Sequence, residues 1–208
     1  MQRRRLAVLA SLVVAGCGYN TIQQKDERAN AAQSQIEVQL QRRADLVPNL
    51  VQTVKGYAQH EEQVFTNIAN ARASLLGAVQ SHDPEQMANA EAQFNGALGR
   101  LLAISEAYPQ LKADQNFLRL QDELSGTENR IAVARSDYND AVRDYNTYIR
   151  QFPTAVTARV TGAKERKYFQ VTNPGAREAP TVDFSRPATS APAASSPATS
   201  ARPATTSP

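Results

Sequence analysis

The sequence is poor in the residue types that build reactive or cross-linked sites. Its 208 residues include one cysteine, two histidines and no tryptophan. A single cysteine excludes an internal disulfide, and His60 and His82 lack the one-turn spacing with which paired histidines bind zinc. Neither histidine belongs to a recognisable set of nucleophile, base and acid, and there is no glycine-rich phosphate loop. These absences predict a protein that is not an enzyme and that needs no metal or cofactor.

The first residues have the three parts of a secretory signal. Three arginines at positions 3 to 5 are followed by an apolar run from Leu6 to Val14, and then by the small residues Ala15 and Gly16. The apolar run is well short of the roughly 18 residues that a membrane-spanning helix requires. We therefore expect residues 1–16 to be a signal peptide that is removed from the mature chain.

Cys17 follows this signal directly, and Leu12–Cys17 resembles the lipobox of bacterial lipoproteins. In such proteins the cysteine is acylated and becomes the first residue. The resemblance implies a lipid anchor over residues 17–20 that faces the periplasm, and Gly18 after the cysteine implies the outer membrane rather than the inner one. The alternative is an ordinary cleavable signal beside a lone buried cysteine. A free thiol would be a liability in an oxidising compartment, which favours acylation.

Removal of the signal changes the charge balance. The full chain has 23 basic and 20 acidic residues, and three of the arginines lie in the signal. The mature chain therefore carries 20 residues of each sign. The apparent basic character does not predict binding to nucleic acid.

The C-terminal residues 185–208 are a low-complexity segment of proline, alanine, serine and threonine. After Phe184 there is no aromatic or large aliphatic side chain, so the segment cannot bury enough apolar area to offset its ordering entropy. We expect a disordered tail. Its composition suits a solvated tether, and a site of O-glycosylation is the alternative.

Between these ends the apolar residues follow helical periods almost throughout. Large residues recur every seven positions over 116–152, at Phe117, Leu124, Ile131, Tyr138, Tyr145 and Phe152. A helix is predicted over 84–108, with Asp83 as N-cap and Pro84 in its first turn. Others are predicted over 21–76 and 154–161, with an extended segment over 168–184. The fold class is therefore all-α: an elongated antiparallel three- to four-helix bundle over residues 21–184, with a disordered C-terminal tail.

Pro48 lies inside the longest predicted helix. Proline lacks a backbone N–H and costs about 3 kcal/mol in a helix interior. The apolar pattern continues through it without a phase shift, from Val47 to Leu50 and Val54. One kinked helix is therefore favoured, and a break at which Pro48 begins a new helix is the alternative.

A group of polar residues lies in and after the same stretch: Arg42, Arg43, Asp45, Asn49, His60 and Glu61. Arg43 is seven residues after Ile36 and seven before Leu50, so it lies on the apolar face of the predicted helix. A charge in that position must be paired if it is buried. Asp45 and Glu61 are the carboxylates nearby in the sequence. A charged network that fixes helix register is favoured, and an internal site for a ligand or ion is the alternative.

These features together resemble the LemA family of bacteria. The resemblance has three blocks in order, namely Gln35 to Leu50 with its continuation to Arg72, the pairs Tyr138-Asn139 and Tyr145-Asn146, and the ending Pro180 to Phe184. Members usually begin with a transmembrane helix where this chain has the lipobox, and they often carry a tryptophan where Gln33 stands. The resemblance implies a membrane-tethered helical bundle without established catalytic residues, and it associates the family with envelope maintenance or membrane shaping.

The expected function is that of a membrane-anchored, non-enzymatic scaffold or interaction module of the cell envelope. Its expected partners are the membrane, through the lipid on Cys17, and an envelope protein that the sequence does not identify. The alternative is a bundle that senses a ligand or signal through an internal polar site containing Arg43, Asp45 and Glu61.

Overall fold

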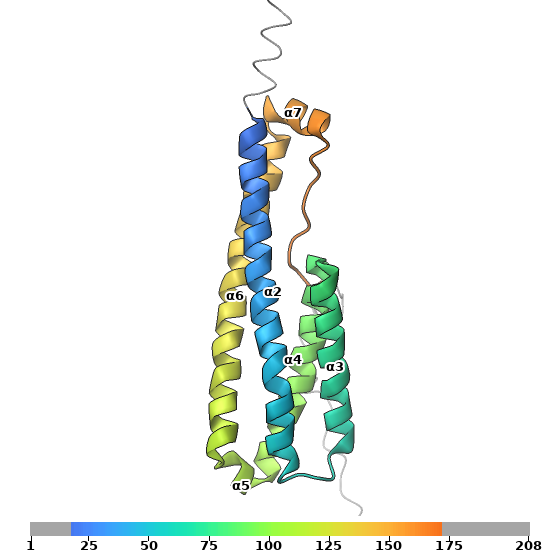
Figure 1. Ribbon diagram of the computed structural model, residues 1–208, viewed down its shortest axis with the longest axis vertical. Coiled ribbons are helices and arrows are strands. Elements are labelled where there is room, and N and C mark those ends of the chain that lie inside the picture. The colour runs from blue at the N-terminus through green and yellow to red at the C-terminus, as the bar shows by residue number, and fades with distance from the viewer. Residues whose placement is uncertain (1–17, 172–208) are drawn as a thin grey trace, which may run out of the picture. The chain divides into compact units, whose positions relative to one another are not determined.

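The computed structural model describes residues 18–171 of the chain. Within them lie six helices and no strand: α2 (Tyr19–Lys55), α3 (Glu62–Ser81), α4 (Pro84–Ala107), α5 (Pro109–Lys112), α6 (Gln115–Arg150) and α7 (Thr154–Thr161) (Figure 1). The predicted all-α helical bundle is confirmed. The predicted signal peptide, Cys17, the end of the predicted extended segment and the predicted tail lie outside the described residues.

The two longest helices, α2 and α6, pack side by side (Figure 1). Arg28 of α2 lies 3.8 Å from Asp144 of α6, and Arg43 of α2 pairs with Glu128 of α6. Residue numbers rise along one helix as they fall along the other, so the two helices are antiparallel. At about 1.5 Å per residue each of them is about 55 Å long.

The helix predicted over 21–76 is wrong, because the chain reverses between Lys55 and Glu62. The amides of Gly56 and Tyr57 bond back to the last turn of α2, and Ala58 is buried at the turn. Tyr57 in this turn is 39% exposed, and its hydroxyl donates to Asp114 Oδ2 at 2.9 Å. The reversal allows α3 and α4 to pack against the second half of α2 (Figure 1).

Pro48 does not break α2, which runs through it to Lys55. The alternative of a new helix beginning at Pro48 is therefore wrong. Proline cannot donate to the carbonyl four residues earlier, which is that of Ala44. Arg72 of α3 donates its Nε–H to this Ala44 oxygen at 2.8 Å. A side chain from the next helix thus satisfies the acceptor that proline leaves open.

The predicted ends of the later helices are largely confirmed. Asp83 is the N-cap of α4 and accepts from the amides of Glu85 and Gln86, with Pro84 as the first helical residue. Helix α7 begins at Thr154 and ends at Thr161, as predicted. The apolar row of α6 stops earlier than expected, since the helix ends at Arg150 and Phe152 is 87% exposed.

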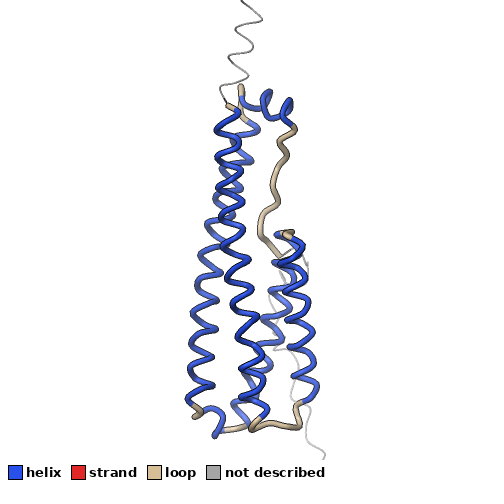
Figure 2. The backbone as a smooth tube through the Cα atoms, in the orientation of Figure 1, coloured by secondary structure: helices blue, strands red, loops and turns tan. Residues whose placement is uncertain are grey.

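Residues 163–171 come after α7, have no regular secondary structure and are held by side chains of α6 (Figure 2). Asn146 accepts from the amide of Arg166 at 2.8 Å and donates to its carbonyl at 2.9 Å. Asn139 makes the same pair of bonds with Phe169, at 2.9 and 3.2 Å. Seven helical residues and three extended residues both advance by about 10 Å, so the two pairs match in register. The predicted extended segment is confirmed where it is described.

The apolar core has two parts. The larger one joins α2, α3, α4, α6 and Phe169, with Phe94, Phe117 and Tyr138 among its fully buried members. The smaller one lies at the α7 end and consists of four buried residues, Ile22, Tyr145, Ile149 and Ala158.

Candidate functional site

Cys17 lies outside the described residues, and its acylation stays a prediction. The next residue, Gly18, is described and lies against the first residue of α7. A Cβ built on Gly18 would lie 2.6 Å from Cγ2 of Thr154, whose hydroxyl is held by the carbonyls of Tyr148 and Gln151. Only glycine fits here without a shift of Thr154. The residue after the predicted anchor is therefore fixed at the α7 end of the bundle.

Arg43 is buried, as its position in the apolar stripe predicts, with 6% of its surface exposed. Its guanidinium pairs with the carboxylate of Glu128 on α6 and lies 5.6 Å from the ring centre of Phe94 on α4. Its partner is thus remote in sequence, and neither Asp45 nor Glu61 takes that place. Arg43 joins three helices through these contacts.

A second ion pair extends this group. Glu91 of α4 is 2% exposed, and its Oε2 lies 3.6 Å from Nη1 of Arg135 on α6. Arg135 also lies over the ring of Phe169, 5.2 Å from its centre. Glu128 and Arg135 are seven residues apart and so share a face of α6. We name Arg43, Glu91, Glu128 and Arg135 the internal charge network.

Glu91 is the member of the internal charge network whose charged form is disfavoured by burial. Burial raises the pKa of Glu91 above its ordinary value of 4.5, the cations Arg135 and Arg43 oppose that rise, and Glu128 adds to it. Its Oε1 has no hydrogen-bond partner among the described residues. With two arginines and two glutamates, the internal charge network has two charges of each sign. Its ion pairs can fix the register of three helices. The unpartnered oxygen of Glu91 can alternatively take up a proton.

Arg42, Asp45 and Asn49 lie on the exposed side of α2, apart from the internal charge network. Asp45 accepts from Gln41 at 3.0 Å and lies 3.6 Å from Nη2 of Arg72. Arg42 and Asp45 help to line an open hollow of about 500 Å³. These residues belong to the surface of the α2–α3 contact.

His60 and Glu61 lie in the turn between α2 and α3. His60 is exposed, and Glu61 is the N-cap residue of α3 without a capping bond from its side chain. Arg43 lies about 18 Å back along α2 from Lys55, so the structure does not bring the turn and Arg43 together. Within residues 18–171, no cluster of three or more histidine, cysteine, aspartate or glutamate side chains is placed to hold a metal ion.

Three members of the internal charge network, Glu91, Glu128 and Arg135, are not predicted from the sequence. Glu128 and Arg135 stand in a run of mixed charges that is typical of a solvated helix face. Glu91 carries a usable signal, because it is four residues after Met87 and seven before Leu98, both of which are buried. A carboxylate in that apolar phase could have been predicted as a buried partner.

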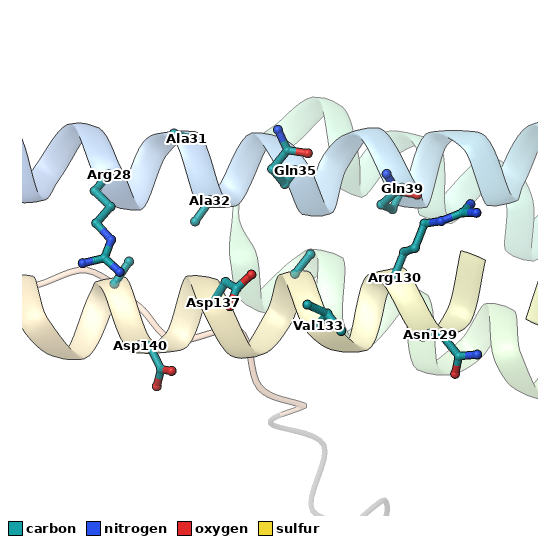
Figure 3. A pocket seen from close by; sticks show the side chains of 12 residues that line it. Arg28, Ala31, Ala32, Gln35, Gln39, Asn129, Arg130, Val133, Asp137 and Asp140 are labelled. Atoms are coloured by element: carbon teal, nitrogen blue, oxygen red, sulfur yellow. The ribbon is translucent and has the colours of Figure 1, made fainter. Parts of the chain in front are cut away.

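An open groove of about 840 Å³ lies between α2 and α6 (Figure 3). Alanines on both helices line it, among them Ala31 and Ala134. Arg28 extends from α2 toward α6, and Arg130 and Asp137 extend from α6 toward α2. Side chains of both signs line the groove, so its charge does not select an anionic or a cationic ligand.

These features define a class of protein. It is an antiparallel helical bundle whose helices are joined by a buried charge network, and in which asparagine side chains of α6 hold an extended segment. The chain belongs to the LemA family, whose sequence profile matches residues 32–184. The whole internal charge network and both Asn139 and Asn146 lie within the matched range. In the part of the chain that the structure describes, every helix is too short or too polar to cross a bilayer.

Named relatives extend the comparison. Magnetosome protein MamQ 2 of Paramagnetospirillum magneticum is 30% identical over 190 residues, which cover 79% of this chain and 69% of that protein. Magnetosome protein MamQ of Magnetospirillum gryphiswaldense is 28% identical over 187 residues, with the same coverage. Protein LemA of Metamycoplasma hominis is 25% identical over 141 residues, covering 67% of this chain and 63% of its own length.

Proposed function

We propose that this chain is a non-enzymatic scaffold or interaction module of the cell envelope. It is held by lipid on Cys17 and faces the periplasm, on the outer membrane rather than the inner one. The observation that carries this proposal is the position of Gly18, which is packed against Thr154 at the α7 end. An anchor on the preceding residue would hold that end and leave the α2–α3 turn and α5, about 55 Å away along α2, for a partner.

Membership of the LemA family and the relatives' names, none of which is an enzyme name, support a membrane-associated role without catalysis. The internal charge network supports a structural role, because interhelical ion pairs at core positions specify one packing register. A bundle with a fixed register presents the same surface to a partner at every encounter.

The test is proximity labelling in cells, with a biotin ligase fused to the C-terminus of the full chain and of the Cys17→Ala variant. The expected result is enrichment of an envelope protein by the wild-type chain and its loss with Cys17→Ala. A Val133→Ala variant, changed at an exposed apolar position in the α2–α6 groove, is the control that keeps the anchor. Equal enrichment by Cys17→Ala, or no envelope protein enriched by the wild type, would contradict the proposal.

A second candidate function is the sensing of a signal inside the bundle, and one observation favours it. Glu91 is buried with an unpartnered oxygen and a raised pKa, so it is poised to take up a proton. In this version Arg43 and Glu91 form the internal polar site, in place of Asp45 and Glu61. Protection of α4 and α6 against hydrogen exchange, corrected for the intrinsic effect of pH on exchange, should then change as the pH falls through the raised pKa of Glu91 in the wild type and not in Glu91→Gln. The same response in both chains would eliminate this function.

A further inference from the structure

Exposed apolar side chains gather at the α7 end of the bundle. Phe152, Val156 and Val160 are 87%, 58% and 83% exposed. Val156 and Val160 are four residues apart and so share one face of α7, while Thr157 and Ala158 are buried on the other. We name Val156 and Val160, together with Phe152 two residues before the helix, the α7 face. The helix is amphipathic, and its apolar side is turned away from the bundle.

Two cations without an ion-pair partner within residues 18–171 lie on and just after α7. From residue 150 to residue 167 the chain has five basic residues and one acidic residue, and three of the five are paired: Arg150 with Glu165, Arg166 with Asp26 and Lys167 with Asp83. Arg159 and Lys164 are exposed, and neither has an ion-pair partner among the described residues. Apolar side chains bordered by cations match the boundary between phosphate headgroups and acyl chains.

The start of α2 lies at the same end (Figure 1). Gly18 is in contact with Thr154, the first residue of α7, and Tyr19 beside it is 44% exposed. Tyrosine is one of the residues enriched at membrane interfaces. The α7 face therefore lies at the end of the bundle where the described chain begins, one residue after the predicted anchor Cys17.

We propose that the α7 face is a lipid-binding surface that lies in the interface of a bilayer containing anionic phospholipids. Phe152, Val156 and Val160 enter the acyl boundary, and Arg159 and Lys164 contact headgroup phosphates. This lipid contact extends the proposed function. It depends on that function only because it requires the chain to be attached to the membrane near Gly18. Three apolar side chains bind lipid weakly by themselves, so the surface acts together with an anchor that keeps it at high local concentration.

The test uses the mature chain, residues 17–208, with Cys17→Ala and a histidine tag in place of the signal peptide, tethered to phosphatidylcholine vesicles that contain phosphatidylglycerol and a nickel-chelating lipid. The tether replaces acylation, so a failure of lipid attachment at Cys17 leaves this test intact. Because Cys17→Ala removes the only cysteine, Val156→Cys provides a single thiol for a polarity-sensitive fluorophore. Val133→Cys on α6 is the matched control, since Val133 is 62% exposed and Val156 is 58% exposed.

The expected result is a blue shift of the label at position 156 on vesicle binding and no shift at position 133. The double change Arg159→Glu with Lys164→Glu should weaken binding of the untethered chain to anionic vesicles by about tenfold or more. Three outcomes would overturn the proposal. They are no shift at 156 on tethered vesicles, an equal shift at both positions, or a shift at 156 that follows protein concentration without lipid, which would mean that a second copy covers the face.

Discussion

The two ends of the bundle are stabilised in different ways. Where α3 and α4 pack on α2 and α6, a large apolar core holds the helices together, and we name this part the wide section. The narrow section comprises the start of α2, the end of α6, α7 and residues 163–167 (Figure 1). There the apolar cluster has four buried members, and Arg166 joins the extended segment to α2 by donating to Asp26 at 2.7 Å and Asn30 at 2.6 Å.

The difference shows what each end is built for. The wide section buries most of its large apolar side chains, with Val38 and Leu118 among the exposed exceptions. The narrow section leaves Phe152, Val156 and Val160 outside and uses hydrogen bonds to hold its shape. A surface with exposed apolar groups remains well defined only if other contacts position it. Asn146 and Arg166 supply such contacts beside α7.

The largest expected effect comes from one substitution made in both sections. Ile36 and Ile22 both lie on α2 and are 0% and 1% exposed, so they form a matched pair. Ile36→Ala should lower the free energy of unfolding by about 3 to 4 kcal/mol, because the surrounding core cannot collapse into the cavity. Ile22→Ala should cost about half as much, since the small cluster can relax. Urea denaturation measures both, and equal losses would contradict the distinction between the two sections.

The next effect concerns the proline in the wide section. Arg72→Met leaves the Ala44 carbonyl without its donor and should cost about 1 to 3 kcal/mol. Pro48→Ala supplies a backbone N–H to the same oxygen, so Arg72→Met should cost less in that background. Asp45→Ala is the control for the exposed ion pair with Arg72 and should cost less than about 1 kcal/mol. A double-mutant cycle without coupling between Arg72 and Pro48 would refute this role.

A smaller and more local effect is expected in the narrow section. Asn146→Ala removes both hydrogen bonds to Arg166 and should cost about 1 to 2 kcal/mol. Hydrogen exchange should accelerate at residues 163–167 and remain unchanged in α3 and α4. Asn129→Ala on the exposed side of α6 is the control and should alter neither. If α3 and α4 also exchange faster in Asn146→Ala, the two sections are one cooperative unit.

The smallest effect is a change in pH dependence within the wide section. Because burial raises the pKa of Glu91 above 4.5, the folded protein holds this proton more tightly than the unfolded chain does. The contribution of Glu91 to stability should therefore fall as the pH rises from about 4.5 through the higher folded-state pKa. Glu91→Gln should remove this fall, so its stability relative to the wild type should increase with pH. Denaturation at several pH values measures it, and parallel curves would show that the carboxylate titrates normally.

The sequence predicts the fold class well, and the exceptions have physical causes. Asp83, a carboxylate N-cap, and Gly162, a glycine directly after residue 161, are local signals that place the start of α4 and the end of α7 correctly. In the structure Gly162 has the positive φ, 74°, that glycine allows. The reversal after Lys55 is not predicted, since Val54 and Phe65 keep the apolar phase across the turn. Periodicity reports which face is buried, and it does not report a change in chain direction.

The candidate site is predicted in part. The phase of Arg43 correctly predicts its burial, because helical position alone decides which face it occupies. Its partner Glu128 is 85 residues later in the sequence, and only the packing of α2 on α6 brings the two together. The repeated Tyr-Asn pairs are visible in the sequence, but the extended segment that Asn139 and Asn146 hold is known only from the fold.

The membrane attachment on which the proposed function rests is tested most directly by metabolic labelling with a palmitate analogue, followed by membrane fractionation. We predict that the wild-type chain incorporates the label and stays in the membrane fraction through alkaline carbonate washing. Cys17→Ala should lose the label and be released by that washing. Label that persists in Cys17→Ala, or a wild-type chain that takes up none, would contradict attachment through Cys17.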